Sequence, residues 1–199
     1  MSQDPNFALL SMDFQNAMCE PDGRIGSAGL ASEIARRGTL DVVAGALATF
    51  RGNGWPVIHV RVAFDASYTR MTSASPRFAS FQANQMMIED SEEAQITPLL
   101  APVGDEPVID KGCVIPFIGT RLPELLTKRG IRHLVLAGVV TNQVVEGTAR
   151  VGADSGFQIS VLEDGCASAN AEMHEFSVTK MLPNFGAVGS AAEILGTLG

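Results

Sequence analysis

The chain has 199 residues, of which 46% are hydrophobic and 18% are charged, and its formal net charge is −8. This length and composition are typical of a globular protein with one core, so we expect a single domain over residues 1–199. The negative charge, with no run of basic residues longer than two, argues against nucleic acid and anionic membranes as partners and favours a small molecule.

Short apolar segments alternate with helical patterns along the chain. Segments rich in Val, Ile and Leu predict buried strands at Phe7–Met12, Pro56–Val62, Leu134–Ala137 and Gln158–Leu162. Apolar residues at helical spacing predict helices at Leu30–Gly52, Thr120–Arg129 and Asn142–Ala153. The alternation predicts an α/β fold of three layers, αβα, with a mainly parallel, Rossmann-like sheet and helices on both faces.

The segment Asp65–Gln95 departs from this alternation. It is rich in Ser, Thr, Pro and Met and shows no clean period, which predicts a long loop with a short helix. Since parallel sheets place their sites beyond the carboxyl ends of the strands, we expect this segment to be a substrate lid there.

Two charged residues follow apolar segments. Asp13 comes directly after Phe7–Met12, where a partly desolvated carboxylate can act as an acid or a base. It could equally cap the following turn. Lys111 follows the short apolar stretch in PVIDKGC, where it could hold an Asp ionised or meet a developing negative charge. Most lysines, however, are solvated surface residues.

The segment Leu136–Arg150, LAGVVTNQVVEGTAR, has the pattern of a strand, a turn and a helix. Backbone amides from Val140 to Val144 would then lie at a helix N-terminus and could bind an anion or a substrate oxygen. The alternative is a simple connection from strand to helix, with Thr141 as the N-cap.

Together these three segments resemble those of the isochorismatase-like hydrolase superfamily. ALLSMDFQN resembles its opening strand with the catalytic Asp, VIDKGCVIPFIGTRLPELL its lysine segment, and LAGVVTNQVVEGTAR its nucleophile segment. The similarity extends from about Phe7 to Leu195. The resemblance implies a site built from Asp13 and Lys111, and a non-proline cis peptide between Val139 and Val140.

The nucleophile position departs from the family pattern. In typical members an Asp takes the proton of a cysteine thiol, a Lys stabilises charge, and the thiolate attacks an amide or related carbon. The corresponding position, six residues after Gly138, is Val144, which cannot be a nucleophile. True isochorismatases also lack the cysteine and cleave a vinyl ether by protonation and water attack. By analogy, Asp13 would protonate the substrate while Lys111 holds the anion or orients water.

We therefore expect a hydrolase that acts on a small molecule without covalent catalysis, with the amides of Val140 and Val144 at a substrate oxygen. Two alternatives stay open. One is a catalytically silent binding protein of the same fold. The other is a cysteine hydrolase whose thiol has moved to another position, for which the candidates are Cys19, Cys113 and Cys166. Their odd number and wide spacings argue against disulfides and structural zinc.

Four further residues are candidates for substrate binding. Arg61 and Phe64 lie at and just beyond the end of the second predicted strand, near the same sheet edge, and Arg61 would hold a substrate carboxylate or form a surface ion pair. Gln15 follows Asp13 and would bind substrate or satisfy its own turn. Phe117 lies in the lysine segment that carries the resemblance.

The sequence indicates no metal and no cofactor, because His59, His133 and His174 are scattered without ligand spacing. Residues 1–5 are polar and lack the pattern of a signal peptide, and no apolar run reaches the roughly 18 residues of a membrane span. We expect a cytoplasmic protein. Members of the superfamily are commonly dimers or larger, so the resemblance also implies a homo-oligomer.

Overall fold

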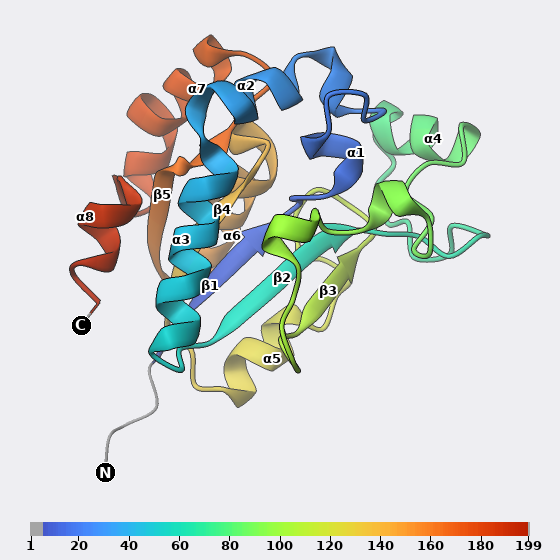
Figure 1. The fold of residues 1–199 in the computed structure, drawn as a ribbon. Helices are drawn as coiled ribbons and strands as arrows, with labels where there is room; N and C mark the ends of the chain where they lie inside the picture. The colour runs from blue at the N-terminus through green and yellow to red at the C-terminus, as the bar shows by residue number, and fades with distance from the viewer. Residues whose placement is uncertain (1–5, 199) are drawn as a thin grey trace.

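A computed structural model describes residues 6–198, and its centre is a six-stranded sheet in which every neighbouring pair of strands is parallel (Figure 1). The strands are β1 Phe7–Met12, β2 Val57–Val62, β3 Val108–Lys111, β4 His133–Val139, β5 Gln158–Ala167 and β6 Ala187–Gly189. Their order is β3-β2-β1-β4-β5-β6. The chain therefore adds β2 and β3 on one side of β1 and then β4, β5 and β6 on the other, so the strand order reverses between β1 and β4. In such sheets a crevice opens at the carboxyl ends of the two strands where the order reverses.

Helices cover both faces of the sheet. The α-helices are α1 Asn16–Cys19, α2 Leu30–Arg37, α3 Thr39–Gly52, α4 Pro76–Ala83, α5 Leu122–Lys128, α6 Glu146–Asp154, α7 Ala171–Phe176 and α8 Ala191–Leu195. Apolar residues of α2, α3 and α8 pack against one face, and those of α5 against the other together with Ala149 of α6. The predicted three-layer α/β architecture is thereby confirmed.

Strand β1 shows why its sequence is an unbroken apolar run. Leu9 belongs to the hydrophobic cluster that contains Phe50 of α3, whereas Leu10 belongs to the cluster that contains Leu126 of α5. All four side chains are fully buried. Because successive side chains point to opposite faces, a strand covered by helices on both sides needs apolar residues at every position.

Two predicted helices differ from the observed ones. Leu30–Gly52 is two helices, because Gly38 adopts a left-handed conformation with φ of 64° and ends α2 before α3 begins. The predicted helix Asn142–Ala153 begins with a π turn at Thr141–Val145 before the regular α6. Apolar periodicity continues through both irregularities, so it could not reveal them.

The connection between β2 and β3 contains one α-helix, the eight-residue α4, in agreement with the long loop and short helix predicted at Asp65–Gln95. Isolated β-bridges attach this connection to the sheet region, with Phe64 paired to Ile88 and Gln15 paired to Ile96. As a result α4 lies beyond the carboxyl ends of β1 and β2 (Figure 1).

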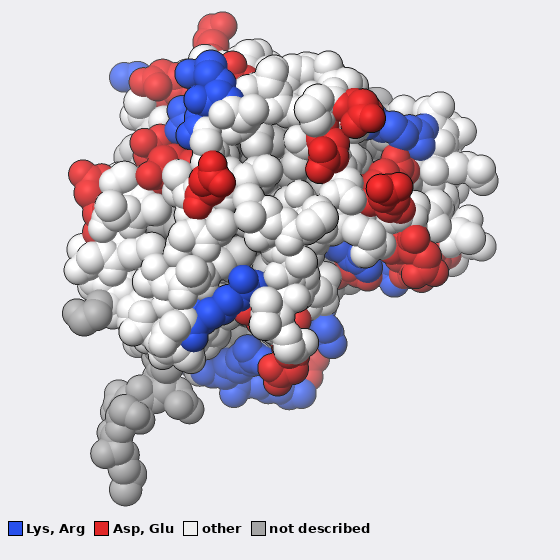
Figure 2. Space-filling view, in the orientation of Figure 1, with Lys and Arg blue, Asp and Glu red and all other residues white. Residues whose placement is uncertain are grey.

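Acidic and basic side chains are interspersed on the face shown in Figure 2, with basic ones gathered toward its lower edge. Within residues 6–198, every helix is too short or too polar to cross a membrane. Residues 1–5, whose polarity contributes to the expected cytoplasmic location, lie outside the described residues.

Candidate active site

A pocket of about 470 Å³ lies at the sheet edge where the strand order reverses. Asp13 lines it from the end of β1, Val139 and Val140 from the end of β4, and Lys111 from the end of β3. Residues far apart in the sequence meet here because the carboxyl ends of parallel strands share one edge. The pocket therefore occupies the edge at which the sequence pattern predicts a site.

Asp13 has an unusual backbone conformation. It follows β1 directly and has a φ of 61°, in the left-handed region that Asp enters more readily than most non-glycine residues. Its amide donates to the carbonyl of Val60 at 2.9 Å, and its carbonyl accepts from the amide of Gln15 at 2.8 Å. These bonds end the strand and fix the carboxyl group in the pocket wall, where the residue is only 4% exposed.

Lys111 reaches Asp13 from the opposite side of β2. Its Nζ donates to Oδ2 of Asp13 at 2.8 Å and to the carbonyl of Cys113 at 3.1 Å, and the residue is 1% exposed. An ammonium group has three N–H donors, so one remains for a substrate or a water molecule. The two opposite charges compensate each other in a region where water cannot solvate them.

Burial and the neighbouring Lys111 act on the pKa of the Asp13 carboxyl in opposite directions. Burial raises the pKa of Asp13, and the attraction and hydrogen bond of the Lys111 ammonium offset that effect only in part. The second oxygen, Oδ1, is buried and has no hydrogen-bond partner among the described residues. A carboxyl group with a raised pKa and a free oxygen can hold a proton and donate it to a bound molecule.

The turn after β4 forms another wall of the pocket. The Val139–Val140 peptide is cis, as the resemblance implies. The π turn Thr141–Val145 follows it and brings Val144, 1% exposed, to the pocket. At the position where the resemblance implies a thiol, the pocket wall is therefore the hydrocarbon side chain of Val144.

Two side-chain hydrogen bonds hold this turn against the segment that follows β5. The hydroxyl of Thr141 lies 2.9 Å from Nδ1 of His174 in α7, and the hydroxyl of Ser168 donates to Oδ1 of Asn142 at 3.0 Å. Burial, and next the positive charge of Arg37, lower the pKa of His174, so its neutral form bonds the turn at neutral pH.

The rest of the pocket wall is mainly apolar. Its larger apolar side chains include Met18, Ile25, Leu30, Phe78, Phe81 and Met86. Helix α4 contributes both phenylalanines together with Arg77 and Ser80, so the connection between β2 and β3 forms one side of the pocket. An apolar wall with a few polar groups is the usual composition of a small-molecule site.

The structure corrects the predicted substrate-binding role of Gln15. Its side chain is fully buried, with Nε2 donating to the carbonyls of Val62 and Ala94 at 2.8 Å each. Its Oε1 accepts from the amide of Val62 at 2.9 Å. Because both ends of the amide are bonded within the protein, Gln15 holds the segment after β1 against β2 and lies outside the pocket lining.

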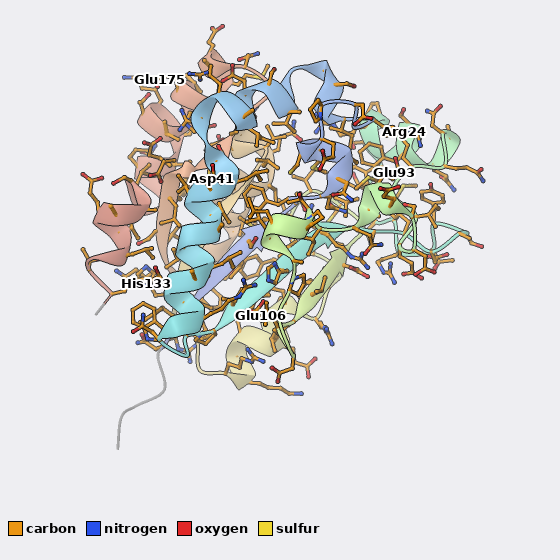
Figure 3. The ribbon with its side chains drawn as sticks, in the orientation of Figure 1. Arg24, Asp41, Glu93, Glu106, His133 and Glu175 are labelled. Carbon is orange, nitrogen blue, oxygen red and sulfur yellow. The ribbon has the colours of Figure 1, made fainter. Side chains whose placement is uncertain are left out.

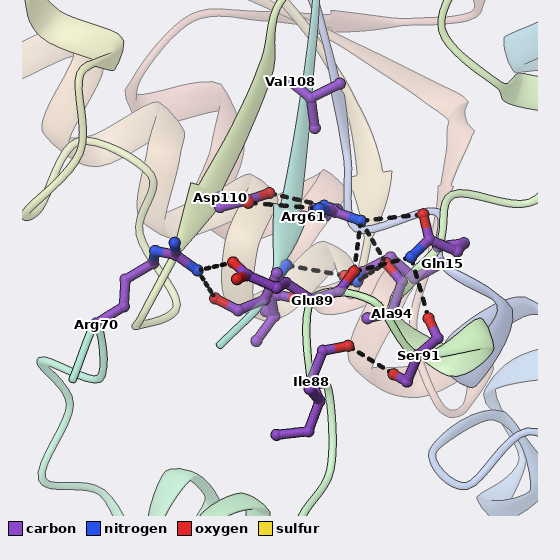
Figure 4. A network of polar contacts seen from close by, with 12 residues as sticks. Gln15, Arg61, Arg70, Ile88, Glu89, Ser91, Ala94, Val108 and Asp110 are labelled. Carbon is purple, nitrogen blue, oxygen red and sulfur yellow. Dashed lines mark hydrogen bonds and ion pairs between the residues drawn. The ribbon is translucent and has the colours of Figure 1, made fainter. Parts of the chain in front are cut away.

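Arg61 also lies away from the pocket. Its guanidinium donates to Oδ1 of Asp110 at 2.7 Å and to the side chain of Gln95 at 3.2 Å, in the network shown in Figure 4. Side chains alternate along a strand, so Val62 faces the pocket while its neighbour Arg61 points to the other face of the sheet. The ion-pair alternative is therefore the one that the structure supports.

Phe64 and Phe117, the two aromatic residues predicted to bind substrate, pack against other side chains of the protein instead. Phe64 is fully buried, with its ring centroid 4.9 Å from that of Tyr68 and 6.1 Å from that of Phe78, so it supports the pocket wall from behind. Phe117 packs at 5.8 Å against Phe157, in the cluster on the α5 face of the sheet. Neither ring belongs to the pocket lining.

Of the residues that the structure describes in the pocket wall, none is a cysteine. Burial raises the pKa of Cys19 to about 12, and burial likewise raises the pKa of Cys166 to about 12. The thiol of Cys113 is directed to the carbonyl of Ile115, at 3.3 Å. These surroundings are those of buried structural thiols rather than of an activated nucleophile.

Sequence reasoning missed Arg24 and the residues of α4. A signal for α4 was present, since Pro76 is a favoured first residue of a helix and Phe78 and Phe81 then share one helix face. Arg77 could have been placed with them. Arg24 lies in an irregular turn after α1, for which the sequence holds no comparable signal.

Comparison with known proteins agrees with the fold. Residues 7–193 match the isochorismatase domain family. The chain is 32% identical to the uncharacterized isochorismatase family protein YecD of Escherichia coli O157:H7, with 96% of this chain and 95% of the relative covered. It is 28% identical to the ureidoacrylate amidohydrolase RutB of Acinetobacter baylyi, with 96% and 82% covered.

Solved structures show the same fold. An isochorismatase family protein from Desulfovibrio vulgaris superposes with a TM-score of 0.84 at 24% identity, covering 98% of this chain and 99% of the other. N-carbamoylsarcosine amidase from Thermoplasma acidophilum gives a TM-score of 0.71 at 20% identity, covering 93% and 96%. Because the family match and the relative at 32% identity both extend over nearly the whole chain, this protein belongs to the isochorismatase family.

Proposed function

We propose that this chain hydrolyses a small molecule by acid and base catalysis, without a covalent intermediate. The observation that carries the proposal is the environment of the Asp13 carboxyl group. Its carboxyl group lines the pocket, burial raises its pKa, and its Oδ1 atom has no partner within the described residues. A carboxyl group whose pKa is raised by burial, and which has a free oxygen, can act as a general acid.

In the proposed reaction, Asp13 donates its proton to the substrate and becomes a carboxylate. The Lys111 ammonium, 2.8 Å from Oδ2, stabilises that negative charge as it forms. A water molecule then adds to the activated carbon, the bond to the leaving group breaks, and the proton lost by the water returns to Asp13. One water is consumed and the acid is regenerated, so atoms and charge balance.

The turn after β4 would bind the substrate oxygen. Val140 and Val144 both line the pocket, and we propose that their backbone amides donate to that oxygen. The side chain of Val144 offers no atom that can attack carbon. Since no thiol lines the described pocket wall, water is the nucleophile that this proposal requires.

The names of two relatives indicate which classes of substrate to test. RutB is named for the hydrolysis of ureidoacrylate, and the Thermoplasma acidophilum protein is named as an amidase of N-carbamoylsarcosine. Amides and ureido compounds therefore belong in a substrate screen. Vinyl ethers belong there too, because their hydrolysis begins with the protonation that Asp13 would perform.

The test is a hydrolysis screen over vinyl ethers, amides, ureido compounds and lactams with product detection by mass spectrometry. Wild type is compared with Asp13→Asn and with Asp41→Asn, which removes an exposed carboxylate from α3. We expect Asp13→Asn to lower kcat by about 100-fold or more and Asp41→Asn to leave it unchanged. Activity that is equal in wild type and Asp13→Asn would contradict the proposal, as would inactivation by iodoacetamide.

The hydrocarbon at Val144 favours a second candidate, a small-molecule binding protein without turnover. Under this alternative a compound binds in the pocket and is recovered chemically unchanged after long incubation. Isothermal titration followed by mass spectrometry of the recovered compound separates the two candidates, because hydrolysis converts the bound compound to products.

A further inference from the structure

The pocket carries an excess of positive charge although the protein as a whole is acidic. The charged residues of its wall are Asp13, Arg24, Arg77 and Lys111, which are three cations and one carboxylate. The formal net charge of the chain is −8. A positive pocket on a negative protein indicates that the wall is arranged for a molecule with negative charge.

Two of the three cations have carboxylate partners. Lys111 is bonded to Asp13 at 2.8 Å. Arg24 lies 3.4 Å from the carboxylate of Glu93 and donates to the carbonyl of Asn84 at 3.0 Å; Figure 3 shows Arg24 and Glu93 side by side. The positive charges of these two residues are therefore already compensated within the protein.

Arg77 is different. Within residues 6–198 it forms no ion pair, and its guanidinium contacts the neutral side-chain oxygen of Gln143. It extends from the exposed side of α4, one residue before the buried Phe78, and both residues line the pocket. Arg77 is thus the pocket cation whose charge remains available to a ligand.

The contact with Gln143 also fixes where such a ligand would lie. Gln143 belongs to the π turn that carries Val144, and it follows Val140 by three residues. Arg77 therefore faces the same turn whose amides are proposed to hold the reacting oxygen. A molecule that reaches from Arg77 to Asp13 would lie in a pocket whose wall also includes the apolar side chains of Phe78 and Val144.

We propose that Arg77 is the specificity-determining residue of this pocket and binds a carboxylate group of a substrate whose remaining body is small and apolar. The inference rests on the proposed function in treating the pocket as the substrate site. It replaces Arg61, whose guanidinium is held by Asp110, as the group that binds a carboxylate.

The number of free charges favours a carboxylate over a phosphate group. A guanidinium presents two parallel N–H donors that match the two oxygens of a carboxylate, and one such pair neutralises both charges. A phosphate group carries more negative charge and would need a second unpaired cation, which the described wall does not supply.

The test measures binding rather than turnover. Cinnamate, 3-phenylpropanoate and hexanoate are titrated by calorimetry beside their primary amides, which have nearly the same shape and no charge, and beside phenylphosphonate. The proteins are wild type, Arg77→Gln, Arg24→Gln and Arg129→Gln. Arg129 lies exposed at the end of α5, outside the pocket, and its replacement changes the net charge by the same amount.

We expect at least one carboxylate to bind wild type about tenfold more tightly than its amide, as for a charge-assisted hydrogen bond at a partly solvated site. That preference is lost in Arg77→Gln and kept in Arg24→Gln and Arg129→Gln. The proposal is overturned if no carboxylate is preferred, if the preference survives Arg77→Gln, or if phenylphosphonate binds most tightly. Hydrolysis without carboxylate preference would refute this subsite alone, and carboxylate preference without hydrolysis would refute the proposed activity alone.

Discussion

At the scale of single residues, Asp13 and Lys111 form one buried ion pair although they are 98 positions apart in the chain. Without the lysine, the buried carboxyl would hold its proton too tightly to release it. Without the carboxylate, the buried ammonium would have no compensating charge. The pair sets the acidity of Asp13 between those limits, and the proposed function requires such an intermediate acidity for Asp13 to give up a proton and recover it.

The pH dependence of activity tests whether Asp13 is the acid. If the protonated form is active, kcat/KM is highest below the raised pKa of Asp13 and falls as the pH increases through that pKa. The measurement is a pH profile of kcat/KM on any substrate found in the screen. A profile that instead rises through this region would show that the carboxylate acts as a base.

Lys111→Met tests the electrostatic dependence of the pair. It leaves a buried carboxyl group without its cation, and we expect the free energy of unfolding to fall by about 3 kcal/mol at neutral pH. The folded-state pKa of Asp13 rises further above its unfolded value, so stability is retained at low pH and lost as the pH rises.

Urea denaturation at acidic and at mildly alkaline pH measures this effect. The double variant Asp13→Asn/Lys111→Met, which removes both charges, should recover most of the stability. An equal loss in Lys111→Met at both pH values would mean that packing of the lysine stem, rather than its charge, is what matters.

Val144→Cys tests the geometry of the nucleophile position. A thiol at position 144 would lie in the pocket wall, so we expect iodoacetamide to modify it faster than the thiol in Val145→Cys. Val145 is a matched control, because it is the next residue of the same π turn, is fully buried, and does not line the pocket. Mass spectrometry of the labelled proteins gives both rates, and equal rates would contradict the placement of Val144.

At the scale of elements, the sequence predicts well where strands lie and poorly how helices end. Strands β1 and β2 match their predicted ranges to within a residue, because burial on both faces leaves an unbroken apolar run. Strands β3 and β6, with four and three residues, are the two edges of the sheet and lack such a run. Helix ends depend on single backbone angles, as at Gly38, which apolar spacing does not encode.

Two glycines, one between α2 and α3 and one within α3, test this account of where the helices end. A Cβ atom would meet no atom within 4 Å at Gly38 or at Gly45, but Gly38 has a φ of 64° and Gly45 lies within α3. We expect Gly38→Ala to destabilise the protein by about 1 kcal/mol and Gly45→Ala to stabilise it by about 0.5–1 kcal/mol. Thermal unfolding measures both, and changes of the same sign would show that backbone conformation is not the cause.

At the scale of the whole molecule, polar groups are buried at both ends of the sheet. Opposite the pocket, Glu106 accepts hydrogen bonds from Arg51 of α3 at 2.8 Å and contacts His59 of β2 at 3.0 Å, and Figure 3 shows Glu106 near the lower edge. Glu106, which lies just before β3, thus links α3 to β2 and to the turn at Val103. Its ionisation should therefore influence global unfolding rather than a local opening.

Acid titration tests that role. Burial disfavours the charged form of Glu106, but hydrogen bonds from Arg51, the Val103 amide and His59 together outweigh it and hold its pKa at about 2. Since this lies below the unfolded value, the stability contributed is complete above about pH 5 and is lost as the pH falls toward 2. We expect Glu106→Gln to lower the neutral-pH stability by about 2 kcal/mol and to flatten the acid dependence.

The control for this titration is Glu124→Gln. Glu124 pairs with Lys128 on the surface of α5, where both side chains are more than 60% exposed, at 66% and 72%. An exposed pair contributes little to stability, so this variant should unfold like wild type at every pH. If Glu106→Gln also behaves like wild type, the partly buried Glu106 carboxylate does not stabilise the folded state.

The candidate site divides into a part that could be predicted and a part that could not. Asp13 and Lys111 follow from the rule that strand ends meet at one edge, together with the family pattern. The substrate-binding predictions for two residues were wrong for local reasons. Arg61 is on the face of β2 opposite Val62, and the side-chain amide of Gln15 is fully hydrogen-bonded to backbone groups. Arg77 belongs to α4, which lies in Asp65–Gln95, the segment whose sequence shows no clean helical or strand period.

The connection that carries α4 has a consequence for how the activity of such a protein could change over evolution. Asp13 and Lys111 are fixed by strands of the core, where most substitutions would cost stability, whereas α4 belongs to a connection outside the sheet. Substitutions in that connection can alter which molecule is recognised while leaving the Asp13–Lys111 pair intact. New substrate preferences are thus accessible through one surface segment, independently of the chemistry below it.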